Sequence, residues 1–236
     1  FVGSRGLGDV YKRQRTYTAT DACGNVSTFE QQVHLVDDIA PVVAFDFCPS
    51  DVTVALDDNC MADTSVDALG TATATASDNC DMPDAVVTYV DSDTLLGCGP
   101  TFEFTRTFTA TATDACGNMA TSVSCSQTIT IEDTTAPAID MAAMDATVEC
   151  DGAGNAADLD GWLASNGGAM ASDACSDVTW SNDFDALSDD CGATGMATVT
   201  FTATDDCGNS SSTTATFTIE DTTAPAIDMA AMDATV

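Results

Sequence analysis

An eight-residue string that carries Asp, Cys and Asn recurs along the chain. It reads TATDACGN at 18–25 and again at 111–118, and TATDDCGN at 202–209. Three roles suit these residue types: an aspartate can help hold a metal ion, a cysteine can act in redox or nucleophilic chemistry, and Asp, Gly and Asn together make tight turns. The string alone leaves all three open, so the elements around it must decide.

A catalytic role for the string has little support. A nucleophilic cysteine needs a nearby histidine or positive charge to form its thiolate. The chain contains a single histidine, His34, and only 5 Lys+Arg. No nucleophile–base pair or pair of catalytic acids is visible, so we expect the protein not to be an enzyme.

The charge of the chain excludes two classes of partner. Its 38 Asp+Glu give a formal net charge of −33. Binding to nucleic acid or to anionic lipid is built on Lys and Arg, so neither is expected. No apolar run approaches the ~18 residues of a membrane span, so we expect no membrane insertion. The acidity indicates either a solvated, self-repelling surface or carboxylates that collect calcium.

The chain is a tandem repeat. A second string follows each copy of the first, as VDDIAP at 36–41 and as IEDTTAP at 131–137 and 219–225, and residues 131–148 return letter for letter at 219–236. We therefore expect a fragment cut at both ends. Its predicted parts are the C-terminal hairpin of a truncated repeat (15–37), two complete repeats (38–133 and 134–221) and the first strand of another truncated repeat (222–236).

The opening residues 1–14 differ from everything that follows. They read FVGSRGLGDVYKRQ and hold three of the few basic residues, without the long apolar core of a signal peptide. They resemble the translated adapter read-through found at the ends of metagenomic reading frames. We interpret them as a non-native leader.

The repeats are predicted to be all-β. In MATVTFTATD (196–205), Val199, Phe201 and Ala203 alternate with threonines, which is typical of a half-buried strand. Units of roughly 90 residues have the size of an immunoglobulin-like β-sandwich. We expect one short helix near 157–166, with Trp162 and Leu163 as its apolar contacts.

In an all-β repeat, the recurring string ends one strand and begins the turn into the next. Its cysteine is then expected to form a disulfide that joins this hairpin to a neighbouring strand. The cysteines are widely spaced with no CxxC pair, which favours disulfides formed in an oxidising extracytoplasmic compartment over a zinc or redox site. Alignment of the two complete repeats suggests five pairs and leaves Cys23 unpaired. The predicted pairs are Cys48–Cys125, Cys60–Cys80, Cys98–Cys116, Cys150–Cys175 and Cys191–Cys207.

Calcium is the one ligand that the acidic residues favour. Several aspartates lie at repeat boundaries or in the turn of the recurring string, where two domains could supply the oxygens that calcium needs. No EF-hand loop occurs, and aspartates at such places also cap turns and strands, so both interpretations stay open. The candidate calcium ligands are Asp38, Asp114, Asp133, Asp205 and Asp221.

Three motifs resemble the hyalin repeat (HYR) family. They are CPSDVTV at 48–54, RTFTATATDACGN at 106–118 and SCSQTITIEDTTAP at 124–137. The resemblance implies immunoglobulin-like domains arranged in tandem in extracellular proteins, with no active site. Arg15 and Arg106 both precede Thr-(Tyr/Phe)-Thr, as an arginine often does in that family. The second repeat lacks the Cys-Pro opening and is similar to HYR-like repeats of very large secreted surface proteins of marine Bacteroidetes.

These observations predict a non-catalytic extracellular region, at the cell surface or secreted. Its expected role is that of a disulfide-stapled acidic spacer or adhesion region whose partners are the neighbouring repeats of the same chain. The alternative is a carbohydrate- or protein-binding module, with calcium as a candidate cofactor and an unknown surface glycan or protein as its partner.

Overall fold

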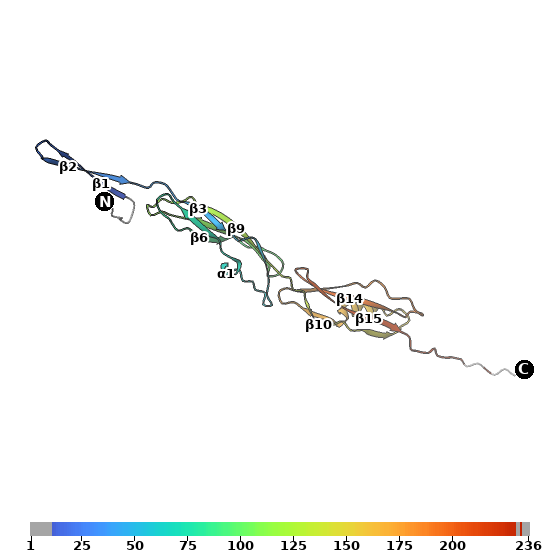
Figure 1. Ribbon diagram of the computed structural model, residues 1–236. Coiled ribbons are helices and arrows are strands. Elements are labelled where there is room, and N and C mark those ends of the chain that lie inside the picture. Colours follow the sequence, from blue (N-terminus) through green and yellow to red (C-terminus); the bar gives the residue numbers. More distant parts are fainter. Residues whose placement is uncertain (1–10, 230–231, 233–236) are drawn as a thin grey trace. The chain divides into compact units, whose positions relative to one another are not determined.

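The computed structural model describes residues 11–229 and 232, which form two compact units. Unit 1 consists of the described residues up to Val54, together with Ala62–Leu96 and Phe102–Ile131. Unit 2 consists of Ala55–Met61, Gly97–Thr101 and the described residues from Glu132 onward. Two loops of the first sequence repeat are therefore part of unit 2. Figure 1 labels several elements of both units and colours the chain from its N-terminus to its C-terminus.

Unit 1 is built almost entirely of strands. Its elements are β1 (Tyr11–Thr20), β2 (Val26–Leu35), β3 (Val42–Phe47), β4 (Val52–Ala55), α1 (Val66–Leu69), β5 (Thr73–Ser77), β6 (Val86–Asp91), β7 (Leu95–Leu96), β8 (Phe102–Thr111) and β9 (Val123–Glu132). One sheet has the strand order β4-β9-β8-β6, with β7 also paired to β8. A second sheet pairs β3 with β5, and a third pairs β1 with β2.

The β1–β2 hairpin includes part of the segment that we interpreted as a leader. Tyr11 pairs with Leu35 and Gln14 with Gln32, so residues 11–14 belong to the ladder that continues to Thr20. Among the described residues, these two strands pair only with each other. The remainder of the predicted leader, residues 1–10, lies outside the described residues.

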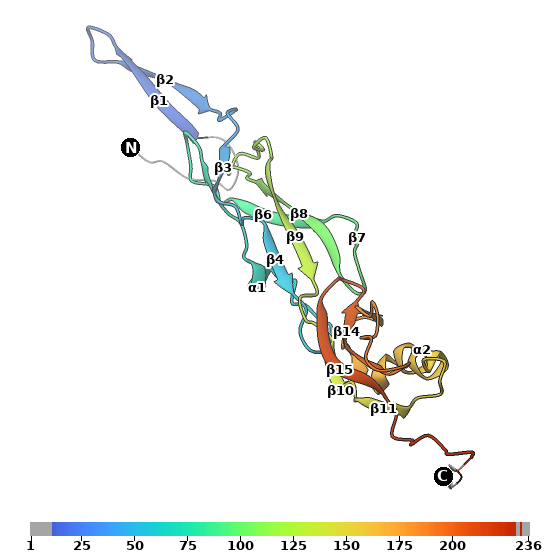
Figure 2. The same ribbon diagram turned by 90° about the vertical axis from the view of Figure 1, so that its right-hand side faces the viewer.

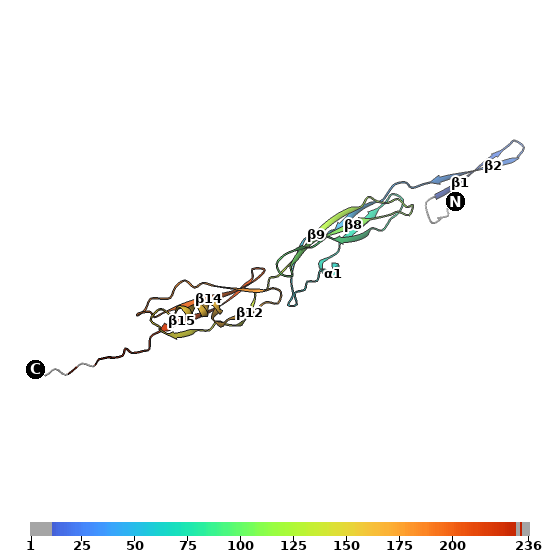
Figure 3. The ribbon, with the colours of Figure 1, turned by 180° about the vertical axis from the view of Figure 1, so that it is seen from behind.

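The core of unit 1 forms where β8 and β9 pair. The two strands are antiparallel, with Phe104 opposite Ile129, and Figure 3 shows them side by side. Side chains of alternate residues point inward, so that Phe104, Phe108, Ile129 and Ile131 are all buried. Burial of large apolar side chains at this spacing stabilises the hairpin by removing their surface from water.

Arg106 occupies an inward position on β8 between two phenylalanines and is buried. Its Nε and Nη2 donate to the two carboxylate oxygens of Asp91 at 2.7 and 2.9 Å, and Nη2 also donates to the Thr64 carbonyl at 3.0 Å. The guanidinium also lies over the ring of Tyr89, 4.8 Å from its centroid. A buried charge is tolerated here because it is paired and hydrogen-bonded.

Unit 2 follows the same plan. Its elements are β10 (Ala138–Met141), β11 (Ala146–Glu149), α2 (Ala156–Ala164), the 3₁₀ turn η1 (Asn166–Gly168), β12 (Met170–Ser172), β13 (Val178–Asn182), β14 (Gly195–Asp205) and β15 (Ser210–Glu220). One sheet has the order β11-β15-β14-β13, and the other pairs β10 with β12. The predicted strand at 222–236 does not form in the described part of that segment.

The predicted all-β class and the predicted strand alternation are confirmed. Val199, Phe201 and Ala203 on β14 are each fully buried, and on β15 Phe217 and Ile219 are buried as well. The intervening threonines point away from this core, as a period of two requires.

The predicted helix is also present, as α2. Figure 2 shows its coiled ribbon beside β14, β15 and β11. Trp162 is buried against Phe201 and Phe217, with ring centroids 5.2 and 5.5 Å apart, and its indole N–H donates to the Met144 carbonyl at 3.1 Å. Leu159 is the second buried residue of the helix, whereas the predicted contact Leu163 is half-buried.

No helix of the described part of the chain is long and apolar enough to cross a membrane.

The short helix α1 was not predicted. The hydroxyl of Ser65 accepts the Ala68 amide at 3.3 Å and caps its first turn.

Substitution of Arg106 tests its structural role. Arg106→Lys keeps the charge but loses the paired hydrogen bonds to Asp91, so we expect the free energy of unfolding of unit 1 to fall by about 2 kcal/mol. The measurement is urea unfolding. The matched control is Arg15→Lys on β1, whose side chain is exposed; it should change stability by no more than about 0.5 kcal/mol. Equal effects of both changes would contradict the role of Arg106.

Candidate functional site

The recurring string forms an aspartate-capped turn. In unit 2, one carboxylate oxygen of Asp205 accepts the amides of Cys207 at 2.9 Å and Asn209 at 2.8 Å. The other oxygen accepts the Asn209 side-chain amide at 2.8 Å. Gly208 between them has φ +89°, which glycine adopts without steric cost.

The other two copies make the same turn. Asp114 accepts the amides of Cys116 and Asn118 at 2.9 and 2.8 Å and the Asn118 side chain at 2.7 Å. The carboxylate of Asp21 accepts the same three groups from the Cys and Asn of its own string, at 2.9, 2.9 and 2.7 Å. The conserved geometry explains why Asp, Gly and Asn recur together.

In the turns of Asp114 and Asp205, the asparagine also holds the linker that precedes its repeat. The side chain of Asn118 donates to the Asp37 carbonyl at 3.1 Å, and that of Asn209 donates to the Asp133 carbonyl at 3.0 Å. The turn therefore fixes both its own cysteine and the position of a linker aspartate.

These hydrogen bonds favour the ionised carboxylate. Burial opposes ionisation of Asp114, but hydrogen bonds from Asn118, Cys116 and Gly117 outweigh it and lower the pKa of its carboxyl. Both carboxylate oxygens of Asp114 and of Asp205 already accept hydrogen bonds within the turn. The sequence left two roles open for these aspartates, calcium ligand and turn cap. The structure directly shows the turn cap for Asp114 and Asp205.

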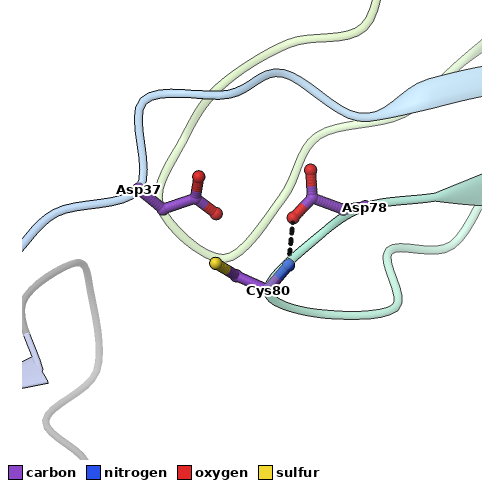
Figure 4. A group of neighbouring side chains, drawn as sticks. All are labelled: Asp37, Asp78 and Cys80. Carbon is purple, nitrogen blue, oxygen red and sulfur yellow. Dashed lines mark hydrogen bonds between the residues drawn. The ribbon is translucent and has the colours of Figure 1, made fainter.

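Beside each linker aspartate lies a small cluster of possible metal ligands. One comprises Asp37, Asp78 and Cys80 in unit 1, drawn in Figure 4, where the Cys80 amide donates to Asp78 at 2.8 Å. In each cluster the candidate ligand atoms lie within 4.8 Å of one another. The second comprises Asp133, Asp173 and Cys175 in unit 2.

The thiol of Cys80 is a poor nucleophile in this cluster. Desolvation, a hydrogen bond with Asp37 and the charges of Asp37 and Asp78 all raise its pKa. A raised pKa keeps the thiol protonated at neutral pH, whereas a catalytic cysteine requires the thiolate.

The cluster in unit 2 is the better candidate for a cation. The sulfur of Cys175 is bonded to Cys60, so it supplies no thiolate, and two carboxylates remain. Asp133 is only 6% exposed, and its Oδ2 has no hydrogen-bond partner. A buried carboxylate oxygen without a partner is costly, and an oxygen-binding cation such as calcium would satisfy it together with Asp173.

The structure separates the predicted calcium ligands. Asp133 is in a cluster, and Asn209 connects it to Asp205. Asp221 is exposed and caps its own linker by accepting the Thr223 amide at 3.0 Å, and Asp38 is exposed. Counted back from the linker proline, the counterpart of Asp133 is Asp37 rather than Asp38.

Sequence reasoning missed Asp78 and Asp173 as cluster members. Each stands two residues before a cysteine, in ASDNC and ASDAC, and its carboxylate accepts the amide of that cysteine. The shared position of the two strings was the available signal.

The structure corrects most of the predicted disulfides. It contains Cys48–Cys125, one of the predicted pairs, with Cα atoms 6.4 Å apart. The other two disulfides are Cys60–Cys175 and Cys98–Cys207, each with Cα atoms 5.2 Å apart. The predicted pairs that are therefore wrong are Cys60–Cys80, Cys98–Cys116, Cys150–Cys175 and Cys191–Cys207.

Strand length is the physical reason for two of these corrections. Cys98 precedes and Cys116 follows the 10-residue strand β8. A strand of that length spans roughly 34 Å, whereas a disulfide requires Cα atoms within about 7 Å. The 11-residue strand β14 separates Cys191 from Cys207 in the same way.

Loop packing in unit 2 brings the observed partners together. The loop Gly97–Thr101 belongs to unit 2 and lies against the turn of Cys175, because a Cβ placed on Gly99 would be 3.1 Å from the Cys175 carbonyl oxygen. Beside it is an open hollow of about 460 Å³ whose lining includes Gly99, Asp173 and Asp206. Among the described residues, Cys23, Cys80, Cys150 and Cys191 form no disulfide.

No protein-family model and no curated protein matches the chain. Among solved structures it is similar to mouse cadherin-23 EC22-24, at 17% identity over 90% of this chain and 75% of that chain, with a TM-score of 0.32. Drosophila N-cadherin EC1-4 matches at 15% identity over 92% of this chain and 59% of that one, with a TM-score of 0.28. The chain spans 38% of the protocadherin GammaB4 extracellular domain, at 16% identity and a TM-score of 0.31, with 88% of this chain covered.

The lowered pKa of Asp114 predicts a pH dependence. A carboxyl whose pKa is lower in the folded state stabilises that state above its unfolded pKa, and the contribution disappears as the pH falls through the folded pKa. Asp114→Ala should therefore be less stable than the native chain near pH 7, with the difference shrinking below about pH 4. Urea unfolding at several pH values measures this. The exposed Asp93→Ala is the control, and a difference that persists unchanged at about pH 2 would contradict the prediction.

If Asp133 and Asp173 bind a cation, calcium should stabilise the folded state of unit 2. A ligand that binds only the folded state raises the melting temperature with its concentration. We expect this rise for the native chain and its loss in Asp133→Asn and Asp173→Asn. Asp185→Asn, an exposed acid of the same unit, is the control. If all four chains respond equally, calcium acts only by screening the negative charge.

Proposed function

We propose that the chain is a non-catalytic extracellular spacer, an acidic and disulfide-stapled region of a large cell-surface or secreted protein. One observation carries the proposal: Cys60–Cys175 and Cys98–Cys207 join cysteines of successive sequence repeats, 115 and 109 residues apart. Bonds of this kind link the first repeat covalently to the second in addition to the backbone.

The bonds support an oxidising location. Three disulfides occur among the described residues, and structural disulfides persist outside the reducing cytosol. Each of the two long bonds closes a loop of more than 100 residues, for which the chain-entropy model gives about 4.7 kcal/mol of stabilisation.

The bonds also define how a stretched chain would carry force. A pull applied at the two ends passes through Cys98–Cys207, so the segment between these cysteines, which are 109 residues apart, is shielded from extension. A spacer of fixed length requires this behaviour, because a domain that unfolds under load lengthens by the full extent of its chain.

The acidic surface suits a spacer in salty water. The net charge of −33 keeps neighbouring molecules apart and the chain soluble. The same self-repulsion disfavours the compact state, and the disulfides offset it.

Features of unit 1 support membership of the hyalin repeat family. Its Cys48–Cys125 disulfide joins two of the motifs that carry the resemblance, CPSDVTV and SCSQTITIEDTTAP. Arg106, the arginine of the third motif, is held in a buried site by Asp91. We propose that both repeats are divergent members of that family.

Single-molecule stretching tests the spacer function. We attach the full chain by its two ends and compare the contour length released on unfolding in oxidised and fully reduced samples. Reduction should lengthen the released chain by at least roughly 360 Å, because the segment between Cys98 and Cys207, which are 109 residues apart, becomes extensible.

The chain with both Cys98→Ser and Cys207→Ser is the matched control. With Cys60→Ser and Cys175→Ser added, it should release a longer contour than the native chain without reductant, but a shorter one than the reduced chain, because Cys48–Cys125 remains and its cysteines are 77 residues apart. If the oxidised native chain extends as far as the reduced one, the disulfides carry no load and the proposed function is wrong.

A further inference from the structure

Cys191 is an exposed thiol that makes no disulfide among the described residues. It lies in the loop before β14, at the position that Cys98 occupies before β8. Cys98 is bonded to Cys207, which belongs to the following sequence repeat. If the loop of Cys191 has the structure of the loop of Cys98, Cys191 can form the corresponding bond.

The two loops have the same hydrogen bonds. In the first, the Thr101 amide and hydroxyl donate to the Cys98 carbonyl at 3.0 and 2.7 Å. In the second, the Thr194 amide and hydroxyl donate to the Cys191 carbonyl at 3.3 and 2.8 Å. A glycine with positive φ follows the cysteine in both, Gly99 at +51° and Gly192 at +68°.

The second half of the bond is equally well defined. Cys207 is held by the aspartate-capped turn, and the same turn recurs at Asp21, where Cys23 makes no disulfide among the described residues. Its conformation is therefore a property of the string itself and does not depend on whether the cysteine is bonded. Both halves of the Cys98–Cys207 link are preformed local structures.

We propose that Cys191 forms a disulfide with the cysteine at the Cys207 position of a further copy of the repeat joined after residue 221. The sequence after residue 221 begins such a copy, since 222–236 is identical to 134–148. The loop of each repeat would then be bonded to the turn of the next, so that covalent cross-links continue from copy to copy. This inference concerns the linkage alone and stands or falls separately from the spacer function.

The reaction is thiol–disulfide exchange. Two cysteine thiols lose two protons and two electrons as one S–S bond forms, and a disulfide oxidant such as oxidised glutathione takes them up and becomes two thiols. The attacking group is a thiolate, and Cys191 is exposed to solvent and to the oxidant.

Cys150, unlike Cys191, does not occupy the position of a bonded cysteine of the first repeat. It donates its amide to the Glu220 carbonyl, as Leu56 does to the Glu132 carbonyl, so Cys150 corresponds to Leu56. The counterpart of Cys60, four residues further on, is Gly154. Cys150 is also partly buried against the core of unit 2, and the inference does not extend to it.

The test extends the full chain after Val236 by a copy of residues 149–221, which completes a further repeat. Both chains are oxidised in a glutathione buffer, labelled with a maleimide and mapped by mass spectrometry without reduction. In the original chain Cys191 should be labelled. In the extended chain the label on Cys191 should be lost, and Cys191 should be found bonded to the added cysteine at the Cys207 position.

Two controls keep the result decisive. Cys191→Ser in the extended chain should expose the added cysteine to the maleimide. The Cys98–Cys207 bond of the same molecule reports correct folding, and Thr194→Ala, which removes the loop hydroxyl, should slow formation of the new bond without affecting Cys98–Cys207. A Cys191 that stays labelled while Cys98–Cys207 is formed, or that bonds within its own repeat, would overturn the proposal.

Discussion

The arrangement of unit 2 depends on one carboxylate. Asp205 holds the amides of Cys207 and Asn209, and Asn209 in turn holds the linker at Asp133. One turn thus connects the end of β14, the entry to the repeat and the cysteine bonded to the loop at Cys98. Because charged acceptors make the stronger hydrogen bonds, a short string can specify a geometry on which long-range bonds rely.

The second constraint is the charge of the chain. A molecule with a net charge of −33 repels itself, which disfavours the compact state. Buried apolar strands and disulfides act against this repulsion in different ways. The strands remove apolar surface from water in each unit, whereas the disulfides limit how far the unfolded chain can expand.

The strands were predictable because their signal is local. Alternation of Val199, Phe201 and Ala203 with threonines leaves only one face for the core, and the structure buries all three. The same alternation in β8 already contained the evidence against Cys98–Cys116, since a 10-residue strand holds its two ends far apart. The alignment of repeats matched Cys98 with Cys191 and Cys116 with Cys207 correctly, but it took Cys150 as the counterpart of Cys60, whereas the structure aligns Cys150 with Leu56. It also could not show whether equivalent cysteines bond within a repeat or between repeats.

The all-β class, the repeat, the turn with its aspartate and the short helix around Trp162 could be predicted from the amino-acid sequence, since each follows from the preferences of neighbouring residues. The partner of each bonded cysteine, the burial of Arg106 beside Asp91 and the proximity of Asp133 to Asp173 became known only from the packed fold. These contacts join residues that are distant in the chain, and they form only when separate strands and loops pack against one another. Spacing along a sequence cannot distinguish two cysteines at opposite ends of a strand from two that face each other.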